Sequence, residues 1–218
     1  MRIALAESEP RTPAVGEDSA KRRQILNGAR EVFLAMGFDA ASMGEIARKA
    51  GVSKGTLYVY FTSKEQLFEA ITHAECKAQV EGLFTFDTDD HDVEAALTRL
   101  GRGYIKFLCR PGGMSPVRTV ISISERMPEI GREFYETGPA QGIATLRRYL
   151  ENEVAAGTLM IDDCEVAAAQ FLELCKATIF LPLLFHAGDP PTEERMNHVV
   201  GIAVRMFLAA YARGARLT

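Results

Sequence analysis

The chain has 218 residues, of which 47% are hydrophobic and 25% charged, and its formal net charge is −4. A chain of this length forms one large domain or a small domain joined to a larger one, and it needs neither disulfides nor a metal for stability. No apolar run reaches the roughly 20 residues that span a bilayer, and the N-terminus lacks the basic flank and apolar stretch of a signal peptide. We therefore expect a cytoplasmic protein and no membrane partner.

The charge is distributed unevenly. Residues 21–66 hold eight Lys or Arg and four Asp or Glu, a net of +4, so the remainder of the chain carries −8. A locally basic segment in an acidic protein indicates a polyanion partner at one end of the molecule. Charge alone favours the simpler interpretation of a solvated, charged helix. A motif within the segment is needed to distinguish this interpretation from a polyanion-binding site.

The four cysteines, Cys76, Cys109, Cys164 and Cys175, are scattered and form no CxxC pair. Cys164 and Cys175 are expected on one helix, about 16 Å apart, which is too far for a disulfide. We expect free thiols in a reducing compartment. His73 lies one helical turn from Cys76, but no further pair completes a tetrahedral site, so we predict no metal and no cofactor.

In chain order, residues 1–20 lack periodicity and predict a disordered N-terminal tail. Apolar residues at helical spacing then predict a first helix, which Gly37 ends. Two capping boxes, each a Ser followed three residues later by Glu or Gln, open further helices. The predicted helices of this part span residues 21–36, 42–50, 54–60 and 63–84, and an acidic loop covers 86–92.

The pattern beyond this loop is again helical, and no stretch shows the alternation of a strand. We therefore predict an all-α fold. The expected helices of this part span residues 93–109, 116–126, 128–137 and 139–156. Asp162 or Asp163 could cap the next helix, which continues to about His186 with a kink at Pro182, and the stretch 190–192 starts the last, which ends near Gly214.

The stretch from Ser42 to Phe61 contains two short capped helices that meet at a tight turn with Gly51. This is the arrangement of a helix-turn-helix, whose second helix enters the major groove of DNA. The exposed face of the second helix offers a cation and hydroxyls for phosphates and apolar groups for thymine methyls. The residues expected to pack against the first helix are Ile46, Ala47, Val52, Leu57 and Phe61.

The run of residues 51–67, GVSKGTLYVYFTSKEQL, resembles the signature of the tetracycline-repressor (TetR) family. The resemblance implies a DNA-binding domain at 21–67 and a helical ligand-binding and dimerisation domain at 68–218. Tyr60 stands where the family often has His, and Val59 where it often has an aromatic residue, which affects base preference more than phosphate anchoring. The DNA-binding residues implied by motif position are Ser42, Met43, Ser53, Lys54, Gly55, Thr56, Tyr58, Val59, Tyr60 and Lys64.

The second domain more loosely resembles the AefR-like branch of that family, in the run VRTV at 117–120 and onward to Pro139. The resemblance implies a cavity for a small effector of unknown identity. An apolar cavity with a few polar groups suits a lipophilic ligand, although each of these residues could instead simply fill the core. The predicted lining residues are Tyr104, Phe107, Met114, Arg118, Met127, Phe134, Gln170 and Phe171.

Two late helices carry apolar residues at helical spacing that could form a four-helix contact across a two-fold axis, or could be ordinary core positions. The need for specificity separately favours a homodimer: one seven-residue helix reads few base pairs, so a specific regulator needs two heads on a palindromic site. The predicted interface residues are Ala167, Phe171, Leu174, Thr178, Val199, Ile202, Met206 and Ala209.

The function expected from the motif and the resemblance is that of a repressor that binds a palindromic operator in double-stranded DNA as a homodimer and is released by a small lipophilic effector. An all-helical enzyme is the first alternative, but the sequence contains no nucleophile elbow, HExxH motif or phosphate loop. A non-specific DNA binder and a helix-turn-helix without a DNA role are the others.

Overall fold

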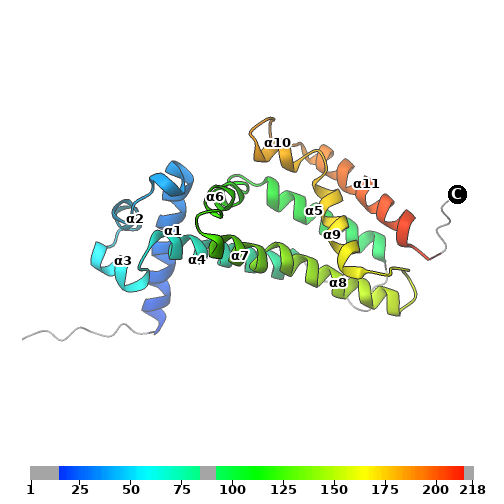
Figure 1. Ribbon diagram of the computed structural model, residues 1–218, viewed down its shortest axis with the longest axis horizontal. Coiled ribbons are helices and arrows are strands. Elements are labelled where there is room, and N and C mark those ends of the chain that lie inside the picture. Colours follow the sequence, from blue (N-terminus) through cyan, green and yellow to red (C-terminus); the bar gives the residue numbers. More distant parts are fainter. Residues whose placement is uncertain (1–14, 84–91, 214–218) are drawn as a thin grey trace, which may run out of the picture. The chain divides into compact units, whose positions relative to one another are not determined.

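The computed structural model of the protein describes residues 15–83 and 92–213, and within these ranges the chain forms eleven α-helices (Figure 1). The all-α prediction is confirmed, because the described residues contain one isolated β-bridge, between Leu159 and Ala212, and no strand. None of the described helices combines the length and apolar character that a bilayer crossing requires.

The chain folds into two compact units, with the boundary between Phe68 and Glu69. We call the described residues 15–68 the head, and the described residues 69–83 and 92–213 the body. The head contains α1 (Val15–Ala40), α2 (Met43–Ala50), α3 (Lys54–Tyr60) and the start of α4 (Lys64–Leu83).

The first helix begins at Val15, six residues before the predicted start at Lys21. Residues 15–20 include Glu and Ala, which have high helix propensity. They lack the apolar spacing on which the predicted start at Lys21 depended. The regular helical backbone breaks at Gly37 (φ 77°, ψ 171°), where the sequence predicted its end. The remainder of the predicted tail, residues 1–14, lies outside the described residues, as do residue 84 of the predicted helix 63–84, residues 86–91 of the predicted loop and residue 214 of the last helix.

The core of the head is apolar and rich in aromatic rings. Phe33, Phe38 and Phe68 form a cluster with ring centroids 5.5 to 6.0 Å apart, an arrangement that adds to the stabilisation from area burial alone. Of the residues predicted to pack against the first helix, four are buried and Val52 is half-buried. The four are Ile46, Ala47, Leu57 and Phe61.

The body has one main hydrophobic core, to which α5, α8, α9 and α11 contribute (Figure 1). Leu97, Leu150, Phe171, Val200 and Phe207 are among its buried side chains. In chain order the helices are α5 (Val93–Cys109), α6 (Ser115–Ile123), α7 (Pro128–Thr137), α8 (Pro139–Ala155), α9 (Cys164–Lys176), α10 (Phe180–Leu184) and α11 (Glu193–Tyr211).

The predicted single helix continuing to about His186 is wrong, because α9 ends at Lys176 and α10 is separate. The break lies at Thr178, whose backbone is left-handed (φ 64°), a conformation that is costly for a β-branched residue. The Nη2 atom of Arg195 donates a hydrogen bond to the Thr178 hydroxyl at 2.8 Å. Pro182 lies in the first turn of α10, where its missing N–H removes no helical bond.

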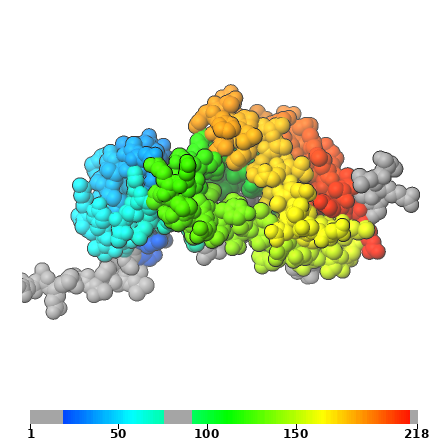
Figure 2. All heavy atoms as spheres, in the orientation of Figure 1, coloured from blue at the N-terminus to red at the C-terminus, as the bar shows by residue number. Residues whose placement is uncertain are grey.

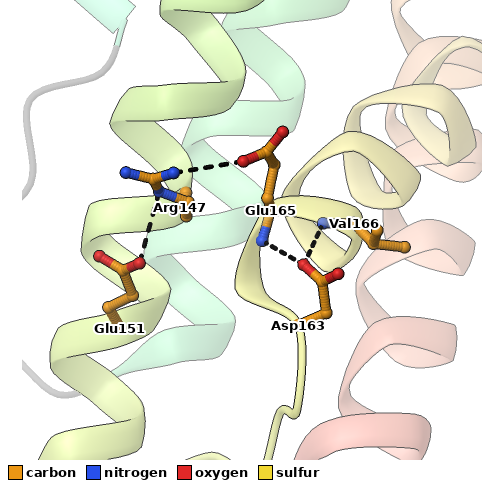
Figure 3. Close-up of polar contacts among 5 residues, drawn as sticks. All are labelled: Arg147, Glu151, Asp163, Glu165 and Val166. Atoms are coloured by element: carbon orange, nitrogen blue, oxygen red, sulfur yellow. Dashed lines mark hydrogen bonds and ion pairs between the residues drawn. The ribbon is translucent and has the colours of Figure 1, made fainter.

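The junction of α8 and α9 is polar (Figure 3). Asp163 caps α9, since its Oδ1 accepts hydrogen bonds from the backbone N–H groups of Glu165 and Val166 at 3.0 Å. Arg147 of α8 pairs with Glu151 at 3.4 Å and with Glu165 at 3.2 Å. Asp163 is thus the cap, of the two candidates Asp162 and Asp163 in the sequence, and such a cap stabilises a helix by about 1 kcal/mol.

Candidate functional site

The helix α2 is fixed at both ends. At its start, the Ser42 N–H donates to Glu45 Oε2 at 3.1 Å and the Glu45 N–H donates to Ser42 Oγ at 3.2 Å, which is the predicted capping box. At its end, Gly51 is left-handed (φ 65°) and the Gln24 side chain donates to the Ala50 carbonyl at 2.6 Å. These contacts set the direction in which the chain enters α3.

The helix α3 has only seven residues and one fully buried side chain, Leu57. Ser53 caps its start, accepting from the Thr56 N–H at 3.0 Å, and the two hydroxyls lie 2.8 Å apart. On the other face Tyr58 is 50% exposed and Val59 is 82% exposed. An isolated helix of this length is unstable in water, so its neighbours hold it in place with this face toward solvent.

The side chain of Lys54 lies beside the start of α2. A Cβ atom built on Gly44 would be 3.0 Å from Lys54 Cε, 3.3 Å from its Nζ and 3.8 Å from Ser42 Oγ. The structure therefore brings together two residues of the predicted DNA-binding set, Lys54 and Ser42, with Met43 between Ser42 and Gly44. Lys54 is exposed, and no ion pair holds it among the described residues.

Lys64 was predicted as a phosphate contact, but its ammonium group is engaged within the head. Its Nζ donates to the carbonyl oxygens of Phe38, Asp39 and Ala41 at 2.8, 3.0 and 3.3 Å, and it lies 4.6 Å from the centroid of the Phe38 ring. An ammonium group has three donors, so this arrangement leaves none for a phosphate. Lys64 fastens the start of α4 to the end of α1.

Two further cations of the head are free to meet a phosphate and were not in the predicted set. Arg23 and Arg48 are exposed and make no ion pair within the described residues, whereas Lys49 pairs with Glu31 at 2.7 Å. The uneven charge of residues 21–66 is the signal that could have identified them.

The body contains an apolar cavity of about 220 Å³. The space-filling view shows the body hollowed between α7 and α9 (Figure 2). Three of the eight predicted pocket residues, Tyr104, Phe107 and Phe134, line it. Phe180 also lines it. The sequence does not single out five other lining residues, because they come together only in the fold. These are Thr72, Arg110, Ala169, Glu173 and Lys176.

The five other predicted pocket residues do not line this cavity. Phe171 is fully buried and packs edge-on against Phe207, with ring centroids 5.5 Å apart. Gln170 accepts from the Tyr211 hydroxyl at 3.1 Å. Arg118 donates from Nε and Nη2 to the carbonyl oxygens of Leu184 and Leu183 at 2.8 and 2.7 Å. The remaining two are Met114, which is buried, and Met127, which precedes α7.

The comparisons with known proteins divide along the same two units. The family described as "Bacterial regulatory proteins, tetR family" matches residues 25–71. The family described as "AefR-like transcriptional repressor, C-terminal domain" matches residues 95–213, more than half of the chain. The chain belongs to the TetR family of transcriptional regulators. Members of this family bind DNA and are not enzymes, in agreement with the sequence analysis.

Solved structures of other TetR-family proteins resemble the whole chain. A regulator from Mesorhizobium loti is 27% identical with a TM-score of 0.83, and the match covers 89% of this chain and 98% of that one. The flavonoid-responsive regulator FrrA is 36% identical with a TM-score of 0.74, covering 90% and 100%. UidR of Escherichia coli K12 is 49% identical over 55 residues, which are 25% of this chain and only 28% of UidR.

The predicted dimer residues of this TetR-family chain divide into two groups. Ala167, Phe171 and Val199 are buried inside the protomer. Thr178 lies beyond the end of α9, since the helix stops two residues earlier. Leu174 is half-buried, and the exposed members on α11 are Ile202, Met206 and Ala209. Val166 on α9 is also exposed and was not predicted.

Within the described residues of the TetR-family chain, no three His, Cys, Asp or Glu side chains lie together as a metal site would need. The side chain of Cys76 lies outside the described residues, so the pair that it makes with His73 in the sequence is not tested. Cys109, Cys164 and Cys175 are free thiols. Burial raises the pKa of Cys175 to about 12, so this thiol stays protonated and unreactive.

Proposed function

We propose that this TetR-family protein is a repressor that binds a palindromic operator as a homodimer and leaves it when a small lipophilic effector binds. One observation carries the DNA part of the proposal. A helix too short to be stable alone is held by a single buried residue, Leu57, while Tyr58 and Val59 stay exposed on its outer face. Exposed apolar side chains of this kind fit the methyl groups in a major groove.

Exposed cations of the head supply the non-specific part of binding. Lys54, Arg23 and Arg48 are exposed and unpaired among the described residues. Each phosphate that such a group neutralises releases counterions from the DNA, and this release makes affinity depend on salt. Lys64 contributes indirectly by holding α1 and α4 together.

Dimerisation is supported by the need for specificity. One seven-residue helix covers few base pairs, and two copies related by a two-fold axis read a palindrome. The exposed apolar residues Ile202 and Met206 on α11 and Val166 on α9 suit an interface between two copies of the chain.

The cavity of the body supports the effector part of the proposal. Its walls are mostly apolar and aromatic, as in sites for small lipophilic molecules. FrrA, the 36% identical relative, is described as flavonoid-responsive. An effector releases the operator only if it binds more tightly to the conformation with low DNA affinity, so that binding shifts the equilibrium toward that state.

The test is selection of duplexes from random DNA, followed by gel-shift titrations at several salt concentrations. We expect one palindrome, a complex that contains two protomers, and a preference over random duplex of about a thousandfold or more. The variant Lys54→Met should weaken binding to all duplexes and lower the salt slope by about one. Lys106→Met is the matched control, since Lys106 pairs with Glu193 on the body. Equal affinity for random duplex contradicts the proposal.

A further inference from the structure

The wall of the body cavity carries a hydroxyl group to which the described residues offer no hydrogen-bond partner. Tyr104 of α5 lines the cavity, and its hydroxyl bonds to no other side chain or backbone group of the described residues. The other hydroxyl in the wall, that of Thr72, donates to the Glu69 carbonyl at 3.0 Å. Tyr104 is half-buried and lines the cavity, so its hydroxyl is accessible to a ligand there, and a ligand that hydrogen-bonds it gains affinity.

The Tyr104 hydroxyl is held in its neutral form. Burial raises the pKa of this phenol well above its ordinary value, and the negative charge of Glu173 and the neighbouring Cys175 raise it further. The group therefore keeps its proton at neutral pH and offers both a donor and an acceptor.

The charged side chains in the wall are already paired. Arg110 binds Glu75 at 2.7 Å and stacks on the Phe107 ring, with its Cζ 3.8 Å from the centroid. Lys176 binds Glu173 at 2.5 Å and lies over the Phe180 ring. Because each of these cations has its own carboxylate, the described wall has no surplus charge for a carboxylate or phosphate, and burying such an anion without a partner is costly.

The size of the cavity and the aromatic rings in its wall favour flat molecules. An apolar cavity of about 150 Å³ accommodates one benzene ring, so a cavity of about 220 Å³ takes a larger ring system but no long acyl chain. Besides the ring of Tyr104, the rings of Phe107, Phe134 and Phe180 belong to its wall. Aromatic rings prefer stacked or edge-to-face neighbours, which a flat ligand provides.

We infer that the effector is a neutral, flat aromatic phenol whose hydroxyl group hydrogen-bonds the Tyr104 hydroxyl between the rings of Phe107, Phe134 and Phe180. The inference rests on the proposed effector cavity and adds the chemical class of its occupant. The competing class is an acyl chain with an anionic head, which would need an unpaired cation and a longer cavity.

The experiment is isothermal titration calorimetry on the full chain without DNA, with 7-hydroxyflavone, flavone and palmitoyl-CoA as probes. We expect 7-hydroxyflavone to bind about threefold to tenfold more tightly than flavone, the effect of one hydrogen bond, and palmitoyl-CoA to bind far more weakly than either. In Tyr104→Phe, which removes only the hydroxyl, the advantage of 7-hydroxyflavone over flavone should vanish. In Tyr135→Phe, which alters an exposed tyrosine outside the cavity, it should persist.

Thermal unfolding of each variant shows whether it is folded, and flavone binding gives a second check because it does not depend on the hydroxyl. The inference is overturned if palmitoyl-CoA binds more tightly than 7-hydroxyflavone, or if Tyr104→Phe keeps the full preference. Gel shifts on the selected operator run in parallel. If the protein binds the operator but not the phenol, the effector class is refuted and the proposed DNA-binding function is not. If the protein binds the phenol but no specific operator, the proposed function is refuted and the effector class is not.

Discussion

The Nζ atom of Lys64 lies 2.8 Å from the carbonyl oxygen of Phe38 and 4.6 Å from the centroid of the Phe38 ring. Phe38 at the end of α1 therefore binds the first residue of α4 through both a hydrogen bond and a cation–π contact. The last carbonyls of a helix have no partner within the helix, and a charged donor satisfies them strongly. Lys64 thus belongs to the framework that positions α3, and its position in the sequence motif does not by itself make it a DNA contact.

The first prediction concerns this framework. Lys64→Met keeps the length and apolar stem of the side chain but removes the ammonium group and its hydrogen bonds to three carbonyls. We expect the free energy of unfolding to fall by about 1.5 to 3 kcal/mol, the range for hydrogen bonds to a charged group. Urea unfolding followed by circular dichroism measures the change.

Lys54→Met is the matched control, because it removes the same charge from an exposed side chain of the same head. We expect it to change the free energy of unfolding by less than about 0.5 kcal/mol, as for an ordinary surface substitution. If both variants lose the same stability, the contacts of Lys64 do not fasten the head.

The second prediction tests how closely α1 approaches α2. A Cβ atom on Gly28 would lie 2.7 Å from the backbone of Ala50, so Gly28→Ala must move the helices apart. We expect a loss of about 1 to 3 kcal/mol in the free energy of unfolding. On Gly55 the nearest neighbour of a Cβ atom is Ser53 Oγ at 3.7 Å, so Gly55→Ala should be neutral or stabilise the head by up to about 1 kcal/mol. Equal effects of the two substitutions would contradict the close approach.

The helices of the head could be predicted from the sequence because their signals are local. The Ser42 capping box and the Gly51 turn each depend on residues within four positions of one another, and both appear in the structure. The capping box at Ser63 differs in part, since Gln66 Oε1 accepts from the Thr62 N–H instead of the Ser63 N–H.

The remaining features depend on contacts between distant parts of the chain. The break after α9 involves a hydrogen bond from Arg195, 17 residues away from Thr178. Phe171 has the apolar character of a pocket or interface residue, but its ring is enclosed by the core and packs on Phe207. Periodicity identifies which residues face inward, and it does not distinguish a core from a cavity wall.

The third prediction addresses the dimer interface. Met206 of α11 is 54% exposed, and Met206→Glu would place a charge in the proposed contact between two copies. Burial of an unpaired charge is costly, so we expect a mostly monomeric protein by sedimentation at micromolar concentration, with weaker operator binding. Met160→Glu is the control, because Met160 is 66% exposed and lies outside α9 and α11. If Met206→Glu dimerises like the parent protein, the interface does not include Met206 and lies elsewhere on the protein.

The fourth prediction separates effector response from DNA binding. Ala169 is half-buried on α9 and lines the cavity. Ala169→Phe adds a ring to a cavity of about 220 Å³, and because one benzene ring needs about 150 Å³, little space remains for a ligand. We expect operator affinity within about twofold of the parent protein and an effector affinity that is lower by about tenfold or more, which corresponds to 1.4 kcal/mol.

Gel shifts with increasing 7-hydroxyflavone measure this response on the selected operator. The parent protein should leave the DNA, while Ala169→Phe should stay bound over the same range. Ala187→Phe adds the same ring at an exposed residue outside the cavity and should respond like the parent. Release of Ala169→Phe at the parent's effector concentration would mean that the effector acts from another site, because a filled cavity cannot transmit a binding event.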